Sequence, residues 1–177
     1  MYRCLIANRG EIAVRIIRAC REMKIETVAI YAKGDEDSLH VSLADQAICI
    51  GEANPLDSYL NIERIISAAE ITGANAIHPG YGFLSESTTF AEAVEENDIH
   101  FIGPNKKTME MMGDKITARQ TVHAANVPVI PGSDGEVESV DEIKKLAEEI
   151  GYPLVLKAAS GGGGKGIRIV KEPEQLE

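Results

Sequence analysis

The sequence PLVLKAASGGGGKGIRIV, residues 153–170, decides how the rest of this chain is interpreted. Both of its ends are apolar, and the second, residues 167–170, is also rich in β-branched residues, which predicts two short strands. Four consecutive glycines lie between them, and Lys165 and Gly166 follow. Glycine lets backbone N–H groups approach a phosphate closely, and Lys157 and Lys165 add positive charge beside the loop. The pattern predicts a glycine flap, residues 157–166, that closes over the phosphates of a nucleotide.

Two other phosphate-binding motifs fit less well. The P-loop requires Ser or Thr after Gly-Lys, but Gly166 follows Lys165, and Ala159 stands where the first glycine belongs. Gly161, Gly163 and Gly166 satisfy GxGxxG, but that fingerprint opens a helix, whereas a strand-like run follows here. The remaining alternative is a glycine-rich linker without a ligand, which would need neither flanking strands nor lysines.

Composition narrows the class of protein. The chain has 177 residues, 44% of them hydrophobic, and a net charge of −10, which disfavours nucleic acid or an anionic membrane as partner. Cys4, Cys20 and Cys49 form no CxxC pair, so we expect reduced core residues in a cytoplasmic protein. No apolar run reaches the length that spans a membrane.

The first hundred residues alternate between strand and helix patterns. Helices are expected from residue 11, over residues 58–72 and from about Thr89, where Thr89 and Glu92 have capping-box spacing. Strands are expected at residues 4–7, 27–31, 47–50, 76–78 and 99–102. The first helix has apolar residues at helical spacing: Ile12, Ile16, Ala19 and Met23. This alternation predicts a Rossmann-like parallel sheet covered on both faces.

The turns after two of these strands are candidate ligand sites. Loops at the carboxyl ends of parallel strands are where ligands bind in such sheets. The turn Asn8-Arg9-Gly10 follows the first strand, and the loop beginning at His78 follows the fourth. The first turn lacks the dinucleotide-binding fingerprint, which disfavours an NAD-binding dehydrogenase.

A C-terminal domain is expected to begin near Met112. Helical patterns cover residues 106–112 and 115–125, and an extended connector follows at residues 127–132. Ser139 and Glu142 form a capping box before a helix that ends near Gly151. We therefore expect domains at residues 1–112 and 113–177. The C-terminal domain is expected to be truncated, so apolar positions of the hairpin such as Val155 and Ile169 should lack full cover.

Several stretches, in this order, resemble the N-terminal part of the biotin carboxylase family, the ATP-grasp subunit or domain of biotin-dependent carboxylases. They are IANRGEIAVRIIRAC, SYLNI, AIHPGYGFLSE, FIGP, MGDK, PVIPGSDG and GYPLVLKAASGGGGKGIRIV. The segments ADQAICIG and ISAAEITGA resemble the bacterial acetyl-CoA carboxylase subunit more than pyruvate carboxylase. The family's flap often has arginine where this chain has Lys165, which keeps the charge but not the planar fork.

The resemblance implies ATP-driven carboxylation of biotin by bicarbonate through carboxyphosphate, with Mg²⁺. It implies a homodimer, with biotin carboxyl carrier protein and carboxyltransferase subunits as partners. By the same resemblance, Tyr81 and Gly82 line the biotin pocket, and Arg18 and Glu22 lie in the dimer interface. The ATP-binding residues that it implies are Lys115, Lys157, Gly161, Gly162, Gly163, Gly164, Lys165 and Gly166. Metal ligands and the general base are expected beyond this chain, which is interpreted as a fragment that is inactive alone.

Each of these residues also has a structural interpretation. Lys115 is also compatible with an exposed helix position, and Tyr81 with a turn aromatic that packs on the sheet, although both alternatives are less favoured. Arg18 and Glu22 are spaced for a surface ion pair on one helix. Lys157 follows apolar neighbours that suggest a mostly buried strand, where an unpaired ammonium is costly.

Other functions remain open from the sequence alone. One is an ATP-grasp ligase of the carbamoyl-phosphate or purine-pathway type, and another is a noncatalytic assembly module. His78 is assigned no catalytic role, because a histidine before Pro79 is compatible with a satisfied core position.

Overall fold

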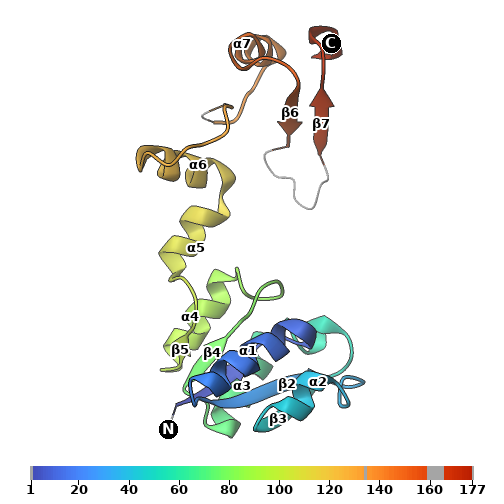
Figure 1. Ribbon diagram of the computed structural model, residues 1–177, viewed down its shortest axis with the longest axis vertical. Coiled ribbons are helices and arrows are strands. Elements are labelled where there is room, and N and C mark those ends of the chain that lie inside the picture. The colour runs from blue at the N-terminus through green and yellow to red at the C-terminus, as the bar shows by residue number, and fades with distance from the viewer. Residues whose placement is uncertain (1, 134, 159–165, 177) are drawn as a thin grey trace. The chain divides into compact units, whose positions relative to one another are not determined.

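A computed structural model describes residues 2–133, 135–158 and 166–176 (Figure 1). The chain divides into two compact units, residues 1–110 and residues 111–177. The helices and strands are, in chain order, β1 (Arg3–Ile6), α1 (Gly10–Glu22), β2 (Glu26–Ala32), α2 (Leu39–Leu43), β3 (Gln46–Gly51), η1 (Pro55–Asp57), α3 (Ile62–Thr72), β4 (Ala76–His78), α4 (Thr88–Glu96), β5 (His100–Phe101), α5 (Lys106–Gly113), α6 (Lys115–Ala124), α7 (Val140–Ile150), β6 (Leu154–Lys157), β7 (Ile167–Val170) and η2 (Pro173–Leu176).

Unit 1 is built on a parallel sheet with the strand order β3-β2-β1-β4-β5. Cys4 of the central strand β1 pairs with Thr27 of β2 on one side and with Ala76 of β4 on the other. The predicted Rossmann-like sheet is therefore confirmed. The chain winds outward from β1 to β3 and then continues on the other side of β1. The strand order reverses between β1 and β4, and loops at such a reversal form the ligand crevice of open α/β sheets.

Both faces of this sheet are covered, as predicted. Successive side chains of a strand point to opposite faces, and β1 follows this rule. Cys4 and Ile6 pack into one core with the buried side of α1, whereas Leu5 packs into the other core with α3 and α4. Burial of a large aliphatic side chain contributes about 1.5–3 kcal/mol. The near-continuous burial of β1 is what a central parallel strand requires.

Helix α1 presents a different face to the core from the one predicted. Ile16 is buried as expected, but Ala19 is exposed and Met23 is 70% exposed. The buried residues of the helix are Ala13, Val14, Ile16, Ile17 and Cys20. The helix therefore carries two overlapping apolar stripes, the predicted one and the buried one, which are offset by about one residue. Both are compatible with the 3.6-residue period of a helix. Contact with Cys4 and Ile6 selects the stripe that is buried.

The helix N-termini also differ in part from the prediction. Helix α3 starts at Ile62 rather than at residue 58, because the Asn61 side chain accepts from the Arg64 N–H and caps it. Helix α4 is capped by Ser87, whose hydroxyl accepts from the Phe90 N–H, so the expected capping box at Thr89 is wrong. The Ser139 cap of α7 is confirmed.

Unit 2 contains α6, α7 and an antiparallel hairpin whose two arrows run in opposite directions in Figure 1. Its small core joins Ala147 of α7, Val170 of β7 and Leu176 of η2. The outer face of the hairpin is open: Val155 is 50% exposed and Ile169 is 61% exposed. The predicted lack of cover over these two positions is confirmed.

Candidate functional site

The turn after β1 and the loop after β4 meet at the point where the strand order reverses. Asn8 is 1% exposed, and its Nδ2 donates to the carbonyl oxygens of Pro79 at 2.8 Å and Tyr81 at 2.9 Å. The Oδ1 of Asn8 accepts from the Arg9 N–H at 2.9 Å. One buried amide therefore ties together two loops that are about 70 residues apart in the sequence.

Tyr81 and Gly82 lie in the loop after β4. The Tyr81 ring is 65% exposed, so the interpretation as an aromatic packed on the sheet is wrong. Its hydroxyl donates to Glu11 Oε1 at 3.0 Å, and this hydrogen bond raises the pKa of Tyr81. Gly82 has φ +72°, and a Cβ there would meet nothing within 4 Å. The loop thus presents an accessible aromatic ring beside a backbone without a side chain.

His78 is held by the same loop. Its Nδ1 lies 3.0 Å from the Gly80 N–H, which donates to it, so this nitrogen acts as the acceptor of a neutral ring. Partial burial lowers the pKa of His78 and also favours the neutral form. This geometry supports the structural interpretation of His78 over a catalytic one.

A polar cluster that the sequence patterns do not indicate lies beside these loops. Tyr59 is 2% exposed; its hydroxyl donates to Asp35 Oδ2 at 2.6 Å and accepts from the Ala32 N–H at 3.0 Å. Burial, followed by the bond to Asp35, raises the pKa of Tyr59. The Arg9 guanidinium lies 3.5 Å from Asp35 Oδ2 and 5.6 Å from the centre of the Tyr59 ring. No local pattern marks these residues, because they come from three separate loops.

The position of Asp35 bears on dinucleotide binding. In NAD-binding folds, an acidic residue at the end of strand β2 accepts from the ribose hydroxyls. Asp35 follows β2, but its carboxylate is engaged by Tyr59 and Arg9. This arrangement adds a structural argument against a dehydrogenase.

The hairpin of unit 2 places Lys157 on an open apolar face. Val155 pairs with Ile169 and Lys157 pairs with Ile167, so these four side chains share one face of the hairpin. Lys157 is exposed, which corrects the expectation of a mostly buried strand. An apolar surface that ends in a lysine can contact a heterocyclic base and, at its edge, a phosphate.

The remaining predicted phosphate-binding residues are placed only in part. Gly166 has φ +74°, and a Cβ there would lie 2.8 Å from the Cβ of Ala158, so the flap needs glycine at this end. Gly161, Gly162, Gly163, Gly164 and Lys165 lie outside the described residues. Lys115 is exposed at the first position of α6, whose N-cap is Asp114.

Arg18 and Glu22 are both exposed on α1. Over the part of the chain that the structure describes, no ion pair joins them, so the interpretation as an intrahelical surface pair gains no support. Their side chains are accessible to a partner.

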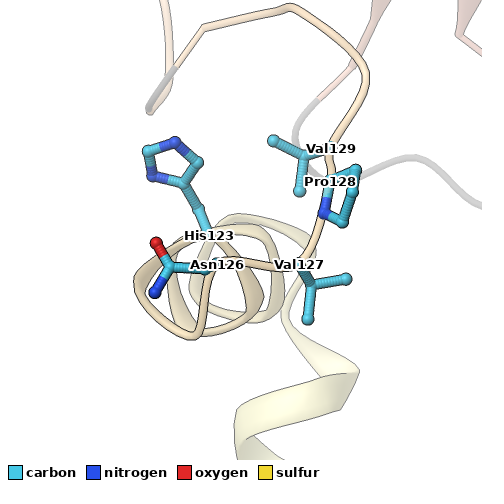
Figure 2. Close-up of a pocket in the computed structure, with 5 residues that line it drawn as sticks. All are labelled: His123, Asn126, Val127, Pro128 and Val129. Carbon is cyan, nitrogen blue, oxygen red and sulfur yellow. The ribbon is translucent and has the colours of Figure 1, made fainter.

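Unit 2 also contains a shallow pocket of about 300 Å³. Figure 2 shows its lining side chains, which come from the end of α6 and the connector that follows. They are His123, Asn126, Val127, Pro128 and Val129. None of them was expected to bind a ligand, and the site described above does not include them.

Within residues 2–133, 135–158 and 166–176, no group of three or more His, Cys, Asp or Glu side chains is arranged to hold a metal ion. None of the described helices combines the length and apolar character needed to cross a membrane.

Known families match both units of the chain. Residues 1–109, more than half of the chain, match the family described as biotin carboxylase, N-terminal domain. The chain belongs to this biotin carboxylase family. Residues 114–177 match another family, carbamoyl-phosphate synthase L chain, ATP binding domain. The resemblance inferred from the sequence motifs is thereby confirmed.

Curated members of the biotin carboxylase family are similar to this chain over nearly the whole of its length. Biotin carboxylase 1 of Bacillus subtilis (strain 168) is 57% identical over 172 residues, which are 97% of this chain and 38% of that protein. The biotin carboxylase of Haemophilus influenzae is 53% identical over 178 residues, or 100% of this chain and 40% of that protein. The chain therefore spans about two fifths of the length of these relatives.

Solved structures of biotin carboxylases have the same fold. The Campylobacter jejuni biotin carboxylase–β-γ-ATP complex matches with a TM-score of 0.88 and 52% identity, over 99% of this chain and 39% of that one. The biotin carboxylase domain dimer of Hydrogenobacter thermophilus 2-oxoglutarate carboxylase was solved with MgADP, ADP and bicarbonate. It matches with a TM-score of 0.84 and 55% identity, over 98% of this chain and 38% of that one.

Proposed function

We propose that this chain is the part of a biotin carboxylase that carries the nucleotide flap and a biotin-facing loop. The proposed reaction joins ATP and bicarbonate to give carboxyphosphate, whose CO₂ passes to the ureido nitrogen of biotin. This is the first half-reaction of acetyl-CoA carboxylase. The observation that carries the proposal is that relatives named biotin carboxylase match 97–100% of this chain, and therefore both of its units.

We assign residues 1–112 to the N-terminal Rossmann-like domain and residues 113–177 to the start of an ATP-grasp domain. In the ATP-grasp domain, Lys115, Lys157 and the flap residues 161–166 bind the phosphates of ATP. The open face of the hairpin supports this assignment, because Val155, Ile167 and Ile169 offer apolar surface beside the Lys157 ammonium. A nucleotide has this combination of a flat base and a charged tail. We place the ligands of Mg²⁺ outside the described residues.

Biotin is assigned to the loop after β4. Its fused ring system is apolar, and its ureido group is polar, so an exposed tyrosine ring beside an unobstructed glycine suits it. Tyr81 and Gly82 provide this surface at the carboxyl edge of the sheet, where the strand order reverses. The bicarbonate bound in the Hydrogenobacter thermophilus relative supports bicarbonate as the other substrate.

The partners follow from the same reaction. We propose that biotin arrives on biotin carboxyl carrier protein and that the carboxyl group continues to carboxyltransferase subunits, in the cytoplasm. The dimer of the Hydrogenobacter thermophilus relative supports a homodimer, and the exposed Arg18 and Glu22 are our candidates for its interface.

An alternative candidate is another acyl-phosphate-forming ATP-grasp ligase, since the model that matches unit 2 is named after carbamoyl-phosphate synthase. The two are separated by ATP cleavage in the full-length protein with biotin or with an amine as acceptor. Cleavage that depends on biotin supports the proposal, whereas cleavage that depends on the amine supports the alternative.

The ATP assignment is tested by titrating MgATP into the full-length protein and its Lys157→Gln variant in a calorimeter. Losing one charge-assisted phosphate contact costs about 1.5–3 kcal/mol, so affinity should fall about 10- to 150-fold. Lys171→Gln is a matched control, because Lys171 follows β7 at the other end of the same hairpin, about 13 Å away along the strands. Unchanged affinity in Lys157→Gln would mean that Lys157 does not bind phosphate.

A further inference from the structure

The loop that carries Tyr81 and Gly82 is not held by regular secondary structure. Residues 79–87 lie between β4 and α4, and three positions have a positive φ: Gly80 at +68°, Gly82 at +72° and Phe83 at +39°. Backbone in this region needs support from its surroundings, because neither a helix ladder nor a sheet ladder stabilises it. The support comes from the turn after β1.

Asn8 supports the backbone of the loop. Its amide donates to the carbonyls on either side of Gly80, those of Pro79 and Tyr81, and the amide itself is buried. Gly80 packs so closely against it that an added Cβ would lie 2.8 Å from Asn8 Nδ2. A buried amide with both hydrogens engaged cannot rotate without leaving polar groups unpaired, so Asn8 determines the path of this backbone.

Glu11 supports the side chain of Tyr81. It lies in the first turn of α1, a helix of 13 residues anchored by its buried face, and a carboxylate is favoured at that helix end. The Tyr81 ring is mostly exposed and is bonded through its hydroxyl to Glu11 Oε1. An exposed ring has several rotamers available, and a bond to a rigid helix selects one of them.

We infer that Asn8 and Glu11 are positioning residues of the biotin site, Asn8 for the loop backbone and Glu11 for the direction of the Tyr81 ring. This inference rests on the proposed function, in which Tyr81 and Gly82 contact biotin. Both residues act through the loop after β4 rather than through the nucleotide flap. They should therefore affect the use of biotin without affecting the use of ATP.

A double-mutant cycle in the full-length protein tests the role of Glu11. Glu11→Ala should raise the KM for free biotin about two- to tenfold, the range expected for one net hydrogen bond, with the KM for ATP unchanged. Glu11→Gln keeps an acceptor oxygen and should restore most of the loss. In a Tyr81→Phe background, Glu11→Ala should have no further effect, because its partner hydroxyl is absent.

Glu63→Ala is the matched control, because Glu63 occupies the first turn of α3 as Glu11 does in α1. It should leave both KM values unchanged. Additive effects of Glu11→Ala and Tyr81→Phe, or an equal rise in both KM values, would overturn the role of Glu11.

Asn8→Ala should also raise the KM for biotin selectively, provided that circular dichroism shows a folded protein. If this variant does not fold, the Glu11 cycle decides the inference. A full-length wild type without biotin-dependent ATP cleavage would instead refute the proposed function. In that case, the hydrogen bond between Tyr81 and Glu11 is tested by NMR titration of the tyrosine rings. Because Glu11 raises the pKa of Tyr81, the Glu11→Gln variant should have a lower Tyr81 pKa than the wild type. An unchanged Tyr81 pKa would overturn the positioning role of Glu11.

Discussion

Replacing Gly80 by alanine should destabilise unit 1 more than the same change two residues later. At Gly80 the added methyl group would lie 2.7 Å from Ile12 Cγ2 and 2.8 Å from Asn8 Nδ2. At Gly82 it would meet nothing within 4 Å. Both glycines have nearly the same φ, +68° and +72°, so the pair separates the effect of the contact from that of the backbone conformation.

The magnitudes follow from this geometry. A residue with a Cβ costs about 1–2 kcal/mol in the left-handed region, offset by about 0.4–1 kcal/mol from the less flexible unfolded chain. These contributions are common to both variants. Crowding against a buried amide and a packed isoleucine adds about 1–3 kcal/mol in Gly80→Ala alone. We expect a total loss of about 2–4 kcal/mol for Gly80→Ala and about 1 kcal/mol for Gly82→Ala.

Hydrogen exchange of the β1 amides measures these losses. The amides of the central strand exchange through global unfolding of the sheet, so their exchange free energies report the stability of unit 1 separately from unit 2. The difference between the two variants should be about 1–3 kcal/mol. Equal losses in both variants would refute the close packing of Gly80 against Asn8, and with it the support that Asn8 gives to the loop.

Two further predictions concern the interior of unit 1. Tyr59→Phe should lower the free energy of unfolding by about 1–3 kcal/mol and speed exchange of the Ala32 amide, which loses its acceptor; protection that stays unchanged would contradict this. His40 is 1% exposed, and this burial lowers its pKa below the unfolded value of about 6.5. The stability that the buried neutral ring contributes is therefore complete above about pH 6.5 and is lost as the pH falls through the lower folded-state pKa. His40→Gln should make the denaturant midpoint less dependent on pH between about pH 7 and pH 5, and an equally steep dependence would exclude this role.

The strands are predictable from the sequence, because their signals are local. Short apolar runs such as residues 4–7 and 76–78 were placed within one residue of β1 and β4. The motif after β6 identified a hairpin with glycines between its strands, and the structure confirms the two strands. Helix caps were less predictable, because Ser87 and Thr89 are both good caps and only the packing of α4 distinguishes them.

The sequence by itself therefore determined the alternation of the five strands with helices α1, α3 and α4, the loop with Tyr81 and Gly82, and the place of Lys157 before the glycines, but it did not indicate α2. The tertiary structure decided which stripe of α1 is buried, that Lys157 is exposed, and that Asn8 and Glu11 hold the loop after β4. It also decided that Asp35 pairs with Tyr59 and Arg9. Periodicity and turn chemistry act between residues a few positions apart. Contacts across about 70 residues form only when parallel pairing of β1 and β4 brings their carboxyl ends together.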